Sequence, residues 1–121
     1  MPKGSPHGHF QTAVERGNVL AAIAAARELG RLQLGDALSL VFLFADKAPE
    51  RFDRAAAQWH ARFVLEADGV GLAESELIRA ALAELRGPGR SAAGEVLAEI
   101  GRRRRLLGVE QAARAYVARA G

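Results

Sequence analysis

Apolar residues recur along this chain at spacings typical of amphipathic helices. The clearest stripe follows Pro49, and its members are Phe52, Ala55, Ala56, Trp59 and Phe63. The spacing of i, i+3, i+4, i+7 and i+11 places these side chains on one face of a helix. Pro49 suits the first turn of that helix, because a proline at this position gives up only a backbone N–H that has no partner within the helix.

The same spacing predicts further helices, separated by glycine-containing breaks. They cover residues 10–16, 19–29, 34–46, 49–68, 73–85, 91 to about 103, and 109–120. The segment 37–45 is apolar around most of a helix circumference, which indicates burial on several sides. A buried strand would also fit so short an apolar run, but the neighbouring segments are helical and no partner strand is visible.

The expected fold is therefore all-α, a single-domain bundle of six to seven helices built from αα-hairpins. We expect this domain to cover residues 9–121 and a disordered tail to cover residues 1–8, which are rich in Pro, Gly and Ser. Leu34, Leu72 and Val109 recur with a period typical of helical-repeat proteins, so a repeat array is an alternative to an irregular bundle.

The composition narrows the possible chemistry. Half of the residues are hydrophobic and none is cysteine, which excludes disulfides, thiolate nucleophiles and Cys-ligated metals. Seventeen basic residues against fourteen acidic ones give a formal net charge of +3, which permits an anionic partner without requiring one. Because the N-terminus has no signal-like apolar stretch and no apolar run could span a bilayer, we expect a cytoplasmic protein without membrane contact.

Recognisable catalytic motifs are absent from the sequence. There is no G-x-S-x-G, Walker or Rossmann glycine pattern, and His60 is the one histidine inside a well-defined predicted helix. His60 has no carboxylate at i+3 or i+4, so its expected role is a structural hydrogen bond. His7 and His9 fall in the predicted tail. We therefore predict a protein that is not an enzyme, with no catalytic residues, no metal site and no cofactor.

Four consecutive arginines, Arg102 to Arg105, interrupt the sixth predicted helix and precede Leu106, Leu107 and Gly108. One interpretation is a helix end, where cations lie favourably beside carbonyls that have no partner within the helix. The other is a nucleic-acid contact, in a helix-turn-helix or as an arginine-rich patch. Four successive residues cannot share one helix face, because each step turns about 100 degrees. This favours the helix end.

The segment "PERFDRAAAQWHARF", residues 49–63, is similar to a pattern found in short hypothetical proteins of GC-rich bacteria. The abundance of arginine, alanine and glycine is also typical of GC-rich coding. The resemblance covers roughly residues 9–85. It implies an all-helical domain, and because that group has no established activity, it assigns no functional residues.

These patterns favour a small helical interaction module that binds a protein partner or a second copy of itself. Its expected contact residues are Leu40 and Phe42, from the segment that is apolar all round, with His60 and Arg62 at the polar edge of the Trp59 helix. The alternative function is a nucleic-acid-binding accessory protein that uses Arg102, Arg103, Arg104 and Arg105.

Overall fold

The computed structural model describes residues 5–120, and all regular structure in that range is α-helical. This confirms the all-α prediction. The helices are α1 (Pro6–Glu15), α2 (Val19–Leu29), α3 (Leu34–Lys47), α4 (Pro49–Glu66), α5 (Leu72–Glu84), α6 (Arg90–Arg103) and α7 (Leu107–Ala120).

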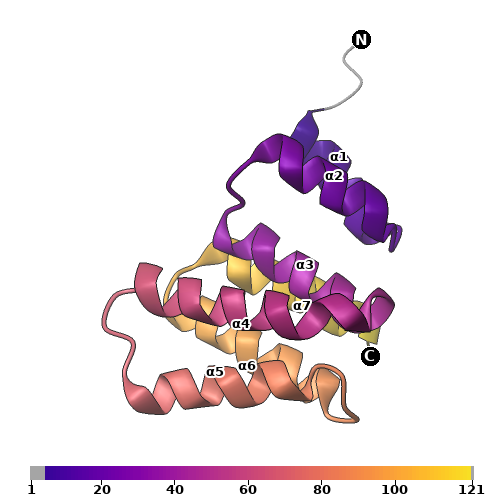
Figure 1. Cartoon of the computed structure of the whole chain (residues 1–121). Helices are drawn as coiled ribbons and strands as arrows, with labels where there is room; N and C mark the ends of the chain where they lie inside the picture. The colour runs from indigo at the N-terminus through magenta and orange to yellow at the C-terminus, as the bar shows by residue number, and fades with distance from the viewer. Residues whose placement is uncertain (1–4, 121) are drawn as a thin grey trace.

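The helices lie in three levels (Figure 1). The hairpin of α1 and α2 forms the top level, α3, α4 and α7 form the middle, and α5 and α6 form the bottom. Helix α7 packs against both α6 and α3, so the end of the chain closes onto its first large helix. In a repeat array each hairpin contacts only its neighbours, and the contact between α3 and α7 therefore favours a closed bundle.

Two aromatic pairs form the centre of the main core. Phe42 of α3 stacks on Tyr116 of α7, with ring centroids 4.2 Å apart and an interplanar angle of 8°. Trp59 and Phe63 of α4 lie one turn apart, with centroids separated by 5.4 Å. Trp59 also donates its indole N–H to the carbonyl of Leu34 at 2.9 Å, which fixes the beginning of α3 against α4. The aromatic stripe predicted for α4 is thus the core face of that helix.

The hairpin of α1 and α2 meets α3 in a smaller, separate core. Ala13, Ala22 and Leu43 form a buried cluster separate from the main one. Small alanines let α1 and α2 approach closely, but they bury little apolar area against α3. The hairpin is therefore attached to the bundle more weakly than α7 is.

The N-terminal boundary differs from the prediction. Residues 5–8 were expected to be disordered, but α1 begins at Pro6, and the Ser5 hydroxyl accepts a hydrogen bond from the Gly8 amide at 3.0 Å. A serine N-cap followed by proline is a helix-start signal that outweighs the local Pro and Gly content. Residues 1–4 of the predicted tail lie outside the described residues.

The last two helices also begin earlier than expected. Helix α6 begins at Arg90, one residue before the expected start at residue 91. Helix α7 begins at Leu107 and contains Gly108, which was expected to precede the helix. Gly108 touches Gly35 at the start of α3, where an added Cβ on Gly35 would lie 2.5 Å from the Gly108 backbone. This close approach explains the glycine at position 35, whereas a Cβ on Gly108 would lie at an ordinary contact distance of 3.6 Å from Gly35.

Candidate functional site

The side chains of Arg102 and Arg103 fold back onto their own helix. Both donate to Glu99, Arg102 at 2.9 and 2.6 Å and Arg103 at 2.9 Å. The hydrogen bond from Arg102 is the main cause, and that from Arg103 the second, that lowers the pKa of Glu99 to about 2. Glu99 thus offsets one of their two positive charges, through ion pairs at the i, i+3 and i, i+4 spacings that are common on helices.

Arg104 is partly buried and joins separate elements of the fold. Its guanidinium forms a bidentate ion pair with Glu74 of α5 and donates to the Asp68 carbonyl at 2.6 Å. It also lies 5.6 Å from the centre of the Phe63 ring. The hydrogen bond from Arg104 lowers the pKa of Glu74. Arg104 therefore joins the end of α6 to the loop between α4 and α5 and is not free to bind a ligand.

Arg105 is the member of the run that remains free. Its backbone is left-handed, with φ of 57°, and its amide bonds to the Arg102 carbonyl at 3.1 Å while that of Leu106 bonds to Gly101 at 2.9 Å. This is a helix-ending turn in which glycine is usually found. The exposed Arg105 guanidinium has no hydrogen-bond or ion-pair partner among residues 5–120.

Replacing Arg105 with glycine should stabilise the fold. An L-residue with left-handed backbone geometry costs about 1 kcal/mol or more, a cost that glycine avoids. We therefore expect Arg105→Gly to raise the free energy of unfolding by up to about 1 kcal/mol in urea denaturation. Arg103→Gly, inside α6, is the matched control and should lower it by about 1 kcal/mol. Equal effects of the two variants would contradict this interpretation of the turn.

The predicted partner-contact residues occupy different environments. Phe42 has a relative exposure of 0%, so its prediction as a contact residue is wrong; α7 covers the side of α3 that carries it. Leu40 is half-buried. His60 bonds to the Ser75 hydroxyl at 3.0 Å, the structural hydrogen bond that its sequence context predicts. Arg62 pairs with Glu66 at 2.8 Å.

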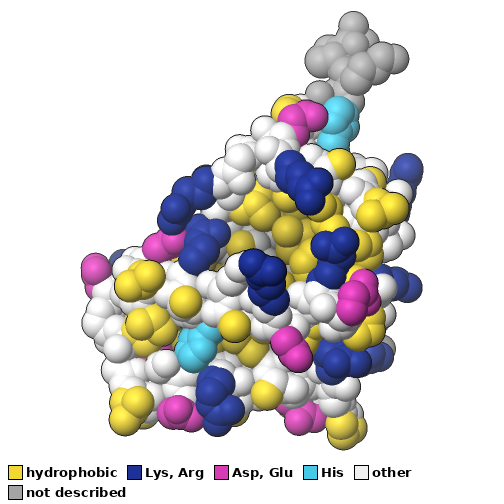
Figure 2. All heavy atoms as spheres, in the orientation of Figure 1, with side chains coloured by type: hydrophobic (Ala, Val, Ile, Leu, Met, Phe, Trp, Pro, Cys, Tyr) yellow, Lys and Arg dark blue, Asp and Glu magenta, His cyan; other side chains and the backbone are white. Residues whose placement is uncertain are grey.

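Leu40 and Arg62 meet in a hollow between α3, α4 and the segment that follows α2. This hollow, the apolar groove, has a volume of about 340 Å³. Figure 2 shows it as a hydrophobic area framed by Lys and Arg side chains. Its lining residues are Gly30, Arg31, Leu32, Ala37, Leu40, Val41, Phe44, Ala55, Gln58, Trp59 and Arg62.

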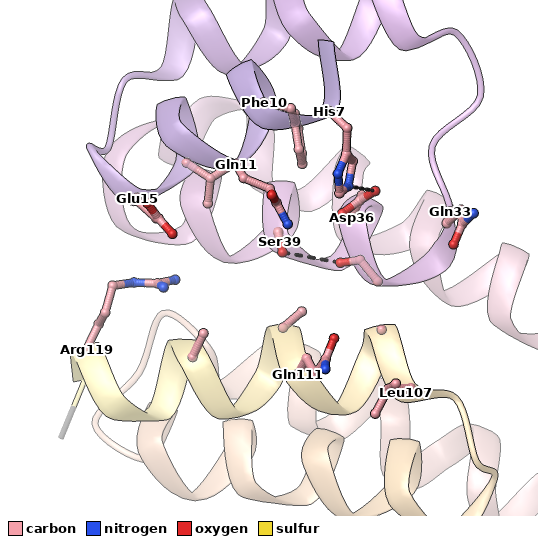
Figure 3. Close-up of a pocket in the computed structure, with 15 residues that line it drawn as sticks. His7, Phe10, Gln11, Glu15, Gln33, Asp36, Ser39, Leu107, Gln111 and Arg119 are labelled. Atoms are coloured by element: carbon pink, nitrogen blue, oxygen red, sulfur yellow. Dashed lines mark hydrogen bonds and ion pairs between the residues drawn. The ribbon is translucent and has the colours of Figure 1, made fainter. Parts of the chain in front are cut away.

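A second hollow, the polar slot, lies between α1 and α7 with α3 at its back (Figure 3). Its volume is about 560 Å³. His7 Nε2 lies 2.9 Å from an Asp36 carboxylate oxygen, while Gln11 and Gln111 approach from opposite walls. The Ser39 hydroxyl donates to the Gly35 carbonyl at 3.3 Å and does not contact His7. Ser39 and His7 therefore do not form a nucleophile–base pair in this structure.

Residues 5–120 contain no group of three or more His, Asp or Glu side chains that could hold a metal ion. No helix among them has the length and apolar character needed to cross a membrane. Comparisons with protein-family models, with curated proteins and with solved structures found no match. The resemblance carried by residues 49–63 remains an expectation.

Sequence reasoning missed the arginine and carboxylate partners that frame these hollows. Arg31 pairs with Glu66 across 35 positions, and His7 pairs with Asp36 across 29. Neither pair has a fixed sequence spacing, so no local pattern signals it. Arg62 and Glu66 are the exception, because an i, i+4 pair on a helix can be recognised from sequence.

Proposed function

We propose that this chain is a helical interaction module that binds an amphipathic, acidic segment of a partner protein in the apolar groove. The observation that carries the proposal is the groove itself, an apolar hollow with arginines at its edge. Small hollows of this kind accept the apolar face of a partner helix.

The groove floor offers apolar surface that water now covers. Leu40, Ala37 and Ala55 are only half-buried, while Val41, Phe44 and Trp59 form a rigid base beneath them. Covering such surface contributes about 0.8 kcal/mol for each buried CH₂ group. A base that is already packed needs little reordering on binding, which lowers the cost of association.

The charge at the edge favours an acidic partner. Arg31 and Arg62 both line the groove, and both bond to Glu66, at 2.6 and 2.8 Å. One carboxylate offsets only one of the two positive charges. Glutamates or aspartates beside a partner's apolar face would form ion pairs with the remaining positive charge. This attraction raises the association rate, and salt screens it, so binding should weaken at high salt.

The groove is tested with a synthetic helical peptide that carries leucines at i, i+3, i+4 and i+7 and glutamates on both flanks. In fluorescence anisotropy at low salt, we expect it to bind about tenfold more tightly than the same peptide with lysine flanks. Gln58→Glu adds a negative charge to an exposed groove residue and should weaken binding. Leu40→Glu should abolish it.

Leu20→Glu is the matched control, because Leu20 is 75% exposed on α2 and does not line the groove. It should leave binding unchanged. Equal binding of the two peptides, or unchanged binding to Leu40→Glu, would contradict the proposal. Light scattering shows whether the chain forms a dimer. If it does, and if Gln58→Glu dissociates that dimer, the occupant of the groove is a second copy of this chain and not another protein.

The nucleic-acid alternative has less support. Arg102 and Arg103 share the carboxylate of Glu99, and Arg104 pairs with Glu74, so phosphate would compete with these ion pairs for the guanidinium donors. Arg105 is the one free guanidinium of the run in the described part of the chain.

A further inference from the structure

Three arginines from distant parts of the chain converge on a third hollow. It has a volume of about 420 Å³ and lies where α3 and α7 begin. Arg31 follows α2, Arg62 belongs to α4, and Arg105 precedes α7. The other lining residues are Leu32, Gln33, Leu34, Gly35, Glu66, Leu106, Leu107, Gly108 and Val109.

The charge in this hollow is unbalanced. Glu66 is the one acidic residue in the lining, against three arginines. Glu66 bonds to Arg31 and Arg62, and the hydrogen bond from Arg62 is the main cause that lowers its pKa, so it stays ionised. Arg105 has no partner, and a guanidinium with five N–H donors keeps free donors even when it is paired. Three cations against one anion leave two positive charges uncompensated.

The backbone adds to this positive potential. The first helical hydrogen bonds of α3 and α7 are those of Ala37 to Gln33 and of Glu110 to Leu106. The amides before Ala37 and Glu110 therefore have no partner within their helices. Gln33 provides no side-chain cap, and Leu106 is apolar. Because Gly35 touches Gly108, both sets of amides lie at the same end of the bundle.

We propose that this hollow, the anion pocket, binds an oxyanion of the phosphate class through Arg105 together with Arg31 and Arg62. Planar guanidiniums bind such groups with paired hydrogen bonds. The two uncompensated charges match those of a phosphate dianion. Arg31, Leu32 and Arg62 line both this pocket and the apolar groove, but Arg105 lines the anion pocket alone, so variants of Arg105 test the two proposals separately.

The test is a titration of the full chain with inorganic phosphate, followed by the amide NMR signals of Gly35 and Gly108. Chloride at matched ionic strength is the reference. We expect saturable shifts with phosphate and none with chloride. Arg105→Gly should weaken binding at least about fivefold, by loss of a charge-assisted hydrogen bond. Its left-handed backbone accepts glycine, so loss of folding would not explain the result.

Arg103→Gln is the matched control: it removes the same charge from the same run but lies outside the anion pocket. It should leave the affinity within about twofold of the original, because an exposed charge outside the pocket is screened. Glu66→Gln should strengthen binding, because it frees donors on Arg31 and Arg62. Linear, non-saturating shifts, or an equal loss in Arg103→Gln and Arg105→Gly, would overturn the proposal. Leu40→Glu, which tests the groove, should leave phosphate binding intact.

Discussion

Phe42→Ala should lower the free energy of unfolding by about 3–5 kcal/mol, as expected for the loss of a large aromatic side chain from a packed core. Phe42 is fully buried and stacks on Tyr116, so its removal leaves a cavity between α3 and α7. It also removes an aromatic contact that contributes beyond the buried area. Urea denaturation followed by circular dichroism measures the change.

Leu40→Ala is the matched control on the same helix. Leu40 is half-buried and borders the apolar groove, so its removal leaves a space that opens to water and should cost clearly less than Phe42→Ala. The two variants should also separate the two roles of α3. We expect Leu40→Ala to weaken peptide binding, and Phe42→Ala to act through stability. If Phe42→Ala is as stable as the original chain and no longer binds the peptide, Phe42 is a contact residue of the interface and this interpretation is wrong.

Arg104→Gln should lower the free energy of unfolding by about 1–2 kcal/mol, since it leaves Glu74 and the Asp68 carbonyl without a charged donor. Both members of the Arg104–Glu74 pair are partly shielded, with side-chain exposures of 19% and 27%. The loss should loosen the loop between α4 and α5, which Arg104 joins to α6. Urea denaturation gives the global change, and hydrogen exchange at Asp68 and Gly69 gives the local one.

The effect of Arg104→Gln should depend on pH. Arg104 lowers the pKa of Glu74 below its ordinary value of 4.5, so the pair contributes fully above that value. Its contribution is lost as the pH falls through the lower, folded-state pKa. The difference between Arg104→Gln and the original chain should therefore shrink in acid. Arg103→Gln, whose side chain is 74% exposed, should change stability too little to measure. Equal losses in the two variants would contradict the special role of Arg104.

Local sequence patterns predicted most of the helices, because a helix-start residue and an apolar stripe both lie within the single helix that they specify. Pro49 begins α4 and the aromatic stripe faces the core, as expected. Asn18 caps α2 by accepting from the Ala21 amide at 3.1 Å. Ser5 was the missed signal, because the Pro and Gly residues around it were taken as marks of a tail.

Long-range packing accounts for the errors at the candidate sites. The apolar circumference of α3 correctly indicated burial on several sides, but it did not show which side α7 would cover, so Phe42 and Leu40 were treated alike. The arginine run was recognised as a helix end, yet the partner of Arg104 lies 30 positions away. Only the three-dimensional structure shows that Arg102, Arg103 and Arg104 have carboxylate partners and that Arg105 has none among the described residues.

The stack of Phe42 on Tyr116 has a consequence for the order of events during synthesis. Its two rings lie at opposite ends of the main core in sequence, so α3 lacks one of its covering partners until residues 107–120 have left the ribosome. At about 5–20 residues per second, the nascent chain exposes the Phe42 side of α3 for several seconds. In contrast, α1 and α2 pair with each other as soon as both have emerged. The smaller core is complete once α3 has supplied Leu43, whereas the main core waits for α7.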